Sequence, residues 1–187
     1  MVPELLKECE DKMKRVVEAT SHEFTLIRTG RANPGILEHV KVDAYGSSLP
    51  INQVAAITVP EPRQLMITPF DRNLISAIEK GILKSDVNLT PNSDGQSLRL
   101  NIPPLNEERR KDLIKQVHQK AEQGRVGLRN VRQDANKRLQ AAKKDKNTPL
   151  PENDEKRAND QVQKLVERFI SEIDSITKGK ETELLEV

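Results

Sequence analysis

The sequence predicts an α+β fold in which a small β/α/β domain is inserted into a long three-helix bundle. Apolar residues follow a three-four rhythm near both ends of the chain, whereas the middle consists of short β-prone runs separated by Gly, Pro, Ser and Asn. Aromatic residues make up only 2% of the chain and charged residues 32%, a balance typical of long helices with narrow aliphatic seams. We predict the bundle over 1–29 and 106–187 and the inserted domain over 30–105.

Three segments carry the helical rhythm: 5–27, 106–146, and the stretch that follows Pro151. We expect Asn106 to cap the second helix, which would be about 60 Å long at ~1.5 Å per residue. The positions expected to face the seams are Leu6, Cys9, Met13, Val16, Thr20, Phe24 and Ile27, then Ile114, Val117, Ala121, Gly124, Leu128, Val131, Ala135 and Ala142, then Val162, Leu165, Val166, Phe169, Ile173 and Ile176.

The middle of the chain contains four β-prone runs: ILEHVKV, INQVAAITV, QLMITPF and SLRLNI. Between the third and the fourth, Asp71 can cap a helix that continues through Lys84. The residues of this helix that we expect to face inward are Leu74, Ile75, Ile78, Ile82 and Leu83.

Glycine and proline mark both ends of the inserted domain. The first joint is the TGRANPG segment at 29–35, and the second is the proline pair near 103–106. The first segment resembles a glycine-rich phosphate loop only superficially, because it lacks the Lys-Ser/Thr that would follow. We therefore predict hinges near 29–34 and 103–106, made by Thr29, Gly30, Asn33, Pro34, Pro103 and Pro104.

The sequence contains no recognisable catalytic or metal-binding motif. His22, His39 and His118 lie on different predicted elements, and HExxH and CxxC are missing. The single cysteine, Cys9, has Leu5, Leu6 and Met13 at helical spacing and is expected to be a buried structural thiol. We expect neither enzymatic activity nor a cofactor.

Membrane insertion is not expected either. No apolar run approaches the roughly 20 residues needed to cross a bilayer. The start, MVPELLKECEDK, has no apolar signal core and is rich in acidic residues. The expected location is the cytoplasm.

Positive charge is concentrated in the second long helix. Residues 106–146 carry a net charge of +7 and the rest of the chain −5, although the total is only +2. At ~100° per residue, one face of this helix gathers basic side chains together with His118, Glu122 and Asn136. The basic stripe, as we call this set, consists of Lys111, Lys115, Arg125, Arg129 and Arg132.

A solvated helix face is the more common explanation of such a stripe. Two features favour RNA instead: arginine, which suits phosphate geometry, dominates the distal half, and acidic residues at i±4 are sparse there. The stripe contains no aromatic residue, which argues against base stacking and favours the backbone of folded RNA.

Four blocks of the sequence resemble the ribosome recycling factors, and the resemblance extends over essentially the whole chain. The blocks are LIRTGRANP at 26–34, NSDG at 92–95, PPLNEERRK at 103–111 and the stretch 126–135. The resemblance implies an L-shaped, monomeric protein with an outline like transfer RNA. It also implies a factor that binds the large ribosomal subunit and its RNA and, with elongation factor G, separates the subunits of the post-termination ribosome, GTP being used by that partner.

The same resemblance assigns roles to single residues. Arg132 matches the family arginine most associated with ribosome binding, and Arg129 lies one turn before it. Arg28 and Arg31 match basic positions of the first hinge strand, where contact with RNA and bracing of the hinge are equally consistent with the pattern. The chain departs from the common family pattern at Gln133, where arginine is frequent, and at Gly127, where a helix former is usual.

Two other functions compete with this assignment. A helical adaptor could bind proteins through its apolar seams without contacting RNA. A hydrolase is disfavoured, because no nucleophile, base and orienting group can be named.

Overall fold

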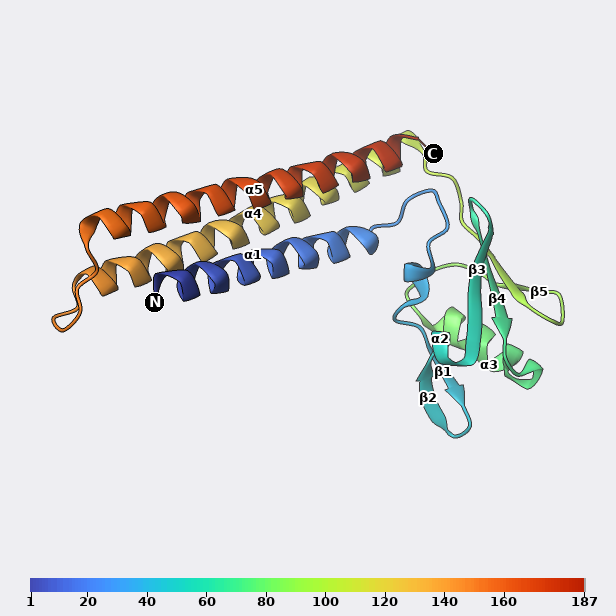
Figure 1. Ribbon diagram of the computed structural model, residues 1–187. Coiled ribbons are helices and arrows are strands. Elements are labelled where there is room, and N and C mark those ends of the chain that lie inside the picture. The colour runs from blue at the N-terminus through green and yellow to red at the C-terminus, as the bar shows by residue number, and fades with distance from the viewer. Residues whose placement is uncertain (187) are drawn as a thin grey trace. The chain divides into compact units, whose positions relative to one another are not determined.

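The computed structural model describes residues 1–186 and divides them into two compact units (Figure 1). The first unit comprises Met1–Ile27 and Asp112–Thr182. The second comprises Arg28–Lys111 together with the end of the chain from Glu183. Both segments predicted as hinges, 29–34 and 103–106, lie inside the second unit.

Three long helices, α1 (Val2–Thr25), α4 (Glu107–Lys143) and α5 (Glu152–Leu185), build the first unit, except for the first residues of α4 and the last residues of α5. The expected cap of α4 is confirmed, because the side-chain oxygen of Asn106 accepts a hydrogen bond of 2.7 Å from the Arg109 backbone N–H. Ion pairs join α4 to α1 through Lys120–Glu23 and Arg138–Glu8. The later residue of α4 pairs with the earlier residue of α1, so the two helices run antiparallel.

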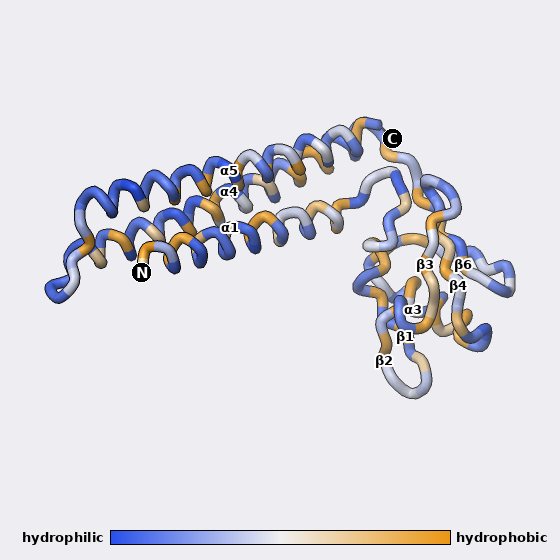
Figure 2. Tube along the Cα trace, viewed as in Figure 1, coloured by the Kyte–Doolittle hydropathy of each residue, from blue (hydrophilic) through white to orange (hydrophobic). Residues whose placement is uncertain are grey.

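The bundle core differs from the predicted seams by about one position in places. Leu5 is buried where Leu6 was predicted, and on α4 Leu113 and Leu139 are buried whereas Ile114, Val131 and Ala142 are only half-buried. The reason is that α4 packs against two helices, so its buried face is centred between the two contacts rather than on a single heptad seam. Figure 2 shows hydrophilic and hydrophobic segments following one another along these helices.

Gly124 allows the close packing of the three helices. A Cβ atom at this position would lie 2.5 Å from Thr20 Oγ1 and 3.0 Å from Ile173 Cδ1, so α1 and α5 both approach the α4 backbone here. At Gly127, the corresponding distance to Val16 Cγ1 is 3.1 Å. Both glycines lower the helix propensity of α4. A side chain at Gly124 would be more crowded by neighbouring helices than one at Gly127.

We predict that Gly124→Ala lowers the free energy of unfolding by about 1 kcal/mol, because overpacking of about 1–3 kcal/mol exceeds the ~1 kcal/mol gained in helix propensity. Gly127→Ala is the matched control. Its single crowded neighbour, Val16, is only half-buried and can shift, so the change should be close to zero. Urea denaturation of both variants measures the difference, and equal stabilities would contradict the packing role of Gly124.

The second unit contains two antiparallel sheets. One is the hairpin of β1 (Lys41–Ala44) and β2 (Ser47–Pro50). The other has the order β3-β4-β6-β5, which corresponds to Ala55–Glu61, Gln64–Pro69, Leu98–Asn101 and Asn92–Ser93. All pairings in this sheet are antiparallel.

Two of the predicted strands were partly wrong. The run beginning at Ile36 is interrupted by a 3-10 turn (Pro34–Leu37), and strand structure starts only at Lys41. The run beginning at Ile51 opens with one helical turn, α2 (Ile51–Val54), before β3. In each case a proline lies at or just before the start of the turn, and its fixed φ is compatible with helical geometry.

The predicted helix of the middle region is confirmed. Asp71 accepts a hydrogen bond from the Asn73 backbone N–H and caps a 3-10 turn (Arg72–Leu74) that leads into α3 (Ile75–Lys84). Leu74, Ile78 and Ile82 are buried in the core of the second unit. Leu83 was predicted to face inward, but it is 55% exposed, because at ~100° per residue it points about 140° away from the buried Ile78.

Together these elements confirm the predicted α+β class, with helices in one unit and small antiparallel sheets with a packed helix in the other. Within residues 1–186, no helix is long and apolar enough to span a membrane.

Candidate nucleic-acid interface

The five residues of the basic stripe lie on α4, but the structure gives them different surroundings. Lys111, Lys115 and Arg129 are exposed, and Arg125 and Arg132 are half-buried. Lys111 pairs with Glu107 one turn earlier on α4, at 3.4 Å. Lys115 forms no ion pair within residues 1–186.

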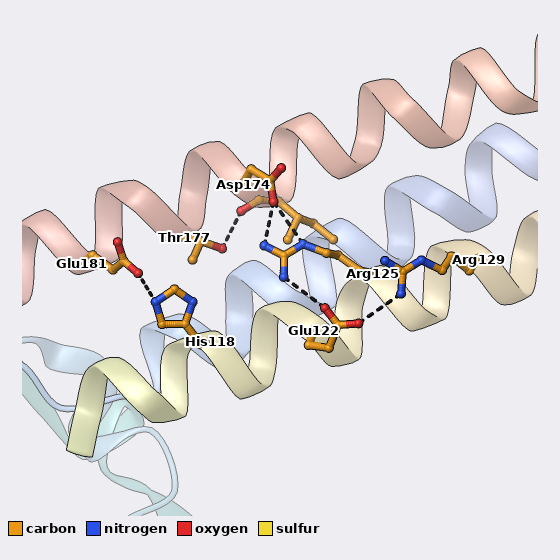
Figure 3. Close-up of polar contacts among 8 residues, drawn as sticks. His118, Glu122, Arg125, Arg129, Asp174, Thr177 and Glu181 are labelled. Carbon is orange, nitrogen blue, oxygen red and sulfur yellow. Dashed lines mark hydrogen bonds and ion pairs between the residues drawn. The ribbon is translucent and has the colours of Figure 1, made fainter. Parts of the chain in front are cut away.

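Arg125 is held by acidic groups on two helices (Figure 3). Its Nε and Nη2 donate to Asp174 Oδ1 on α5 at 3.0 and 2.7 Å, and its Nη1 donates to Glu122 at 3.3 Å. The side chain is only 22% exposed. The hydrogen bond to Asp174 raises the pKa of Arg125 above its ordinary value, and Glu122 adds to this effect. Arg125 therefore joins α4 to α5, and most of its donors are already used.

Arg129 shares the same carboxylate. Its Nη1 donates to Glu122 at 3.0 Å, so Glu122 lies between the two arginines (Figure 3). Hydrogen bonds from Arg129 and then Arg125 lower the pKa of Glu122 below its usual range. Acidic residues are sparse at i±4 from these arginines, as expected, but Glu122 lies three and seven residues before them and pairs with both.

Arg132 differs from both, since its partner is neutral. Its Nη1 donates to the amide oxygen of Gln163 on α5 at 3.3 Å. Within residues 1–186, no carboxylate forms an ion pair with Arg132. Arg132 is thus the arginine of the stripe whose charge is least compensated.

The basic residues of the first predicted joint have partners inside the second unit. Arg28 donates to the backbone carbonyl of Val87, and Arg31 pairs with Glu186 at 3.3 Å. Of the two roles weighed for Arg28, this geometry favours bracing, since its guanidinium fixes the loop after α3. The exposed pair of Arg31 can exchange for another anion at little cost.

The six predicted hinge residues occupy loops with local hydrogen bonds. Thr29 is buried, and its Oγ1 accepts from the Arg31 backbone N–H at 3.2 Å. Asn33 caps the 3-10 turn that begins at Pro34, accepting from the Gly35 N–H at 2.9 Å. Gly30 is buried, whereas Pro103 and Pro104 are exposed after β6. These contacts hold both loops in defined conformations.

Among residues 1–186, no group of three or more His, Cys, Asp or Glu side chains is arranged to hold a metal ion. The burial predicted for Cys9 is confirmed, because its side chain is 4% exposed and burial raises its thiol pKa.

A second charged cluster fixes α1 to α4. Arg138 at 2.8 Å and Lys12 at 3.0 Å hold the pKa of Glu8 at about 2. A carboxyl group with a lowered pKa stabilises the fold at pH values above its ordinary pKa of 4.5, and this stabilisation is lost as the pH falls towards about 2.

We predict that Glu8→Gln flattens the decrease in melting temperature between pH 4.5 and 2. If the melting temperature of Glu8→Gln depended on pH as that of the wild type does, the stabilising role of the Glu8 cluster would be contradicted.

Two residues at the stripe, Gln163 and Asp174, were not identified from the sequence. Both lie on α5, and only the packing of α4 against α5 brings them to Arg132 and Arg125. A signal was available, because acidic residues recur every seven positions at 160, 167, 174 and 181. Such a row on a helix predicts a basic row on its neighbour.

Comparisons with known proteins agree with this architecture. The family model described as "Ribosome recycling factor" matches residues 20–185. The ribosome-recycling factor of Carboxydothermus hydrogenoformans is 47% identical and that of Listeria monocytogenes 48% identical over 187 residues, with all of both chains covered in each case.

Two solved structures are similar over nearly the full chain. A solution structure of a ribosome recycling factor has a TM-score of 0.79 and 38% identity, covering 100% of this chain and 98% of its own. The second, with a TM-score of 0.67, 43% identity and 99% of each chain covered, is described as models for the T. thermophilus ribosome recycling factor and the E. coli elongation factor G bound to the E. coli post-termination complex. The resemblance noted in the sequence is thereby confirmed, and the chain belongs to the ribosome recycling factor family.

Proposed function

We propose that this protein binds the post-termination ribosome and, together with elongation factor G and GTP, separates its subunits at the end of translation. The observation that carries the proposal is the full-length similarity to the T. thermophilus factor that was placed with elongation factor G on such a complex. The protein acts as a monomer in the cytoplasm, needs no cofactor of its own and catalyses no reaction, and its partner consumes the GTP.

The large ribosomal subunit is the binding partner, and α4 supplies the contact with its RNA. Arg132 is the leading residue because its charge is least compensated, and Arg129 follows because its single carboxylate partner is exposed. Lys111 and Lys115 add long-range attraction from the exposed start of the helix. Arg125 serves mainly to join the helices. Because α4 has no Phe, Tyr or Trp, it recognises phosphates rather than unstacked bases.

Subunit splitting by the purified protein tests the whole proposal. Post-termination ribosomes are mixed with the protein, elongation factor G and GTP, and splitting is followed by light scattering or by breakdown of polysomes. Splitting should require all three components. Splitting by the protein alone, or no effect of the protein on the elongation factor reaction, would overturn the proposal.

Salt dependence separates RNA binding from the adaptor function considered above. Because several phosphates release counterions, the affinity for large subunits should fall steeply as salt is raised from about 50 to 200 mM. An interface of apolar helix faces would respond little to salt. A flat titration would therefore favour the adaptor.

The segments around Thr29 and Pro103 act as joints in this proposal. We predict that Thr29→Pro, or deletion of Gly30, reduces subunit splitting more than binding, since the α4 surface is left intact. Splitting rate and affinity for large subunits are measured on the same samples. Equal loss of both would contradict a separate role for the joint.

A further inference from the structure

Contacts between basic residues of α4 and acidic residues of α5 repeat at a spacing of one heptad. His118 pairs with Glu181, and Arg125 pairs with Asp174 at 2.7 Å (Figure 3). Moving seven residues forward on α4 moves the partner seven residues back on α5, which is the register of an antiparallel helix pair. The next rung of this ladder would join Arg132 to Glu167.

Gln163 occupies that rung instead. Its amide oxygen accepts from Arg132 Nη1 at 3.3 Å, and its amide nitrogen donates to Glu167 Oε1 at 3.1 Å. The amide can be oriented in only one way, because arginine has donors alone and an ionised carboxylate has acceptors alone. Gln163 therefore bridges Arg132 and Glu167. It occupies a guanidinium donor and a carboxylate acceptor that could otherwise form a direct ion pair.

The bridge changes what Arg132 can offer a ligand. A carboxylate partner would compensate its charge and would have to be displaced before a phosphate could bind, as at Arg125. An amide oxygen restrains the guanidinium but leaves the full positive charge uncompensated. Arg125 and Arg132 are thus equivalent residues on the same helix, but Arg125 has a carboxylate partner on α5 and Arg132 has an amide partner.

We propose that Gln163 is a positioning residue that prevents Arg132 from pairing with Glu167 and so keeps the Arg132 charge available to an RNA phosphate. The inference rests on the proposed function and deepens it, since it names a residue that sets the strength of the contact. Gln163 does not itself touch the RNA in this scheme.

The test is a set of binding measurements on full-length protein with purified large ribosomal subunits. Gln163→Ala should weaken binding about 1.4-fold to fivefold, because the Arg132–Glu167 pair that forms at the surface is worth about 0.2–1 kcal/mol. In a Glu167→Gln background, the same Gln163→Ala change should have no effect. This rescue identifies Glu167 as the competitor.

Asp160→Asn supplies the matched control for charge. Asp160 is an exposed carboxylate on α5, three residues before Gln163, and it forms no ion pair within the described chain. Gln163→Ala should weaken binding in the Asp160→Asn background as it does in the wild type. The melting temperature of Gln163→Ala should stay level or rise, whereas a merely structural glutamine would lower it.

The outcomes separate the two proposals. If Arg132→Ala leaves the affinity unchanged, the RNA-binding role of Arg132 fails, and this inference fails with it. If Arg132→Ala weakens binding but Gln163→Ala does not, or weakens it equally in all three backgrounds, only the role of Gln163 is overturned.

Discussion

Arg132→Ala is expected to weaken binding to large ribosomal subunits by about 1–3 kcal/mol, or about five- to 150-fold, while melting of the bundle stays nearly unchanged. The loss is large because Arg132 has a neutral partner in the free protein and can give its charge to a phosphate without breaking an ion pair. Stability is preserved because a single hydrogen bond to a surface amide is lost. Filter binding and thermal denaturation measure the two quantities.

Lys137→Ala is the matched control for this prediction. Lys137 is an exposed cation on α4 that forms no ion pair within residues 1–186, and at ~100° per residue it points about 140° away from Arg132. Removing this cation should change the affinity for large subunits only through the small loss of overall positive charge. If both variants lost the same affinity, the stripe would act as diffuse charge and the assignment of Arg132 would fail.

Gly81→Ala is expected to lower the free energy of unfolding by about 3 kcal/mol, the upper end of the range for overpacking. A Cβ atom at this position of α3 would lie 2.6 Å from the backbone carbonyl oxygen of Lys41 in β1. A backbone atom of a paired strand cannot rotate away as a side chain can, so either the helix or the hairpin must move. Urea denaturation of the full-length protein measures the loss.

Gly179→Ala on α5 is the control for helix propensity. No atom lies within 4 Å of a Cβ built there, so this variant should gain up to ~1 kcal/mol. Opposite signs for the two glycines would support the close contact between α3 and β1. A Gly81→Ala variant as stable as Gly179→Ala would refute that contact.

The α+β class and the α4 cap could be predicted because they depend on local chemistry. Asn106 and Asp71 are short side chains that cap their own backbone, and this requires no knowledge of the rest of the fold. The strand starts at Ile36 and Ile51 were wrong because a β-prone run and a preceding proline gave opposite local signals. The burial of Leu113 and Leu139 was missed because it depends on where two neighbouring helices lie.

Residue type and spacing are enough to predict long amphipathic helices, a central region of short strands with a packed helix, and an excess of positive charge on α4. The sequence also identified the family through motifs spread along the chain, which the comparisons confirm. These properties depend on residue type and spacing, so they can be recognised without knowledge of the tertiary structure.

Which charges of the basic stripe are compensated depends on how α4 and α5 pack together. Arg125 and Arg132 are indistinguishable on a helical wheel, yet Asp174 compensates the first and Gln163 holds the second. These partners lie 49 and 31 residues away in the chain and meet the stripe only through the register of α4 against α5. The register of two helices is set by packing of their whole apolar interface, which local sequence does not specify.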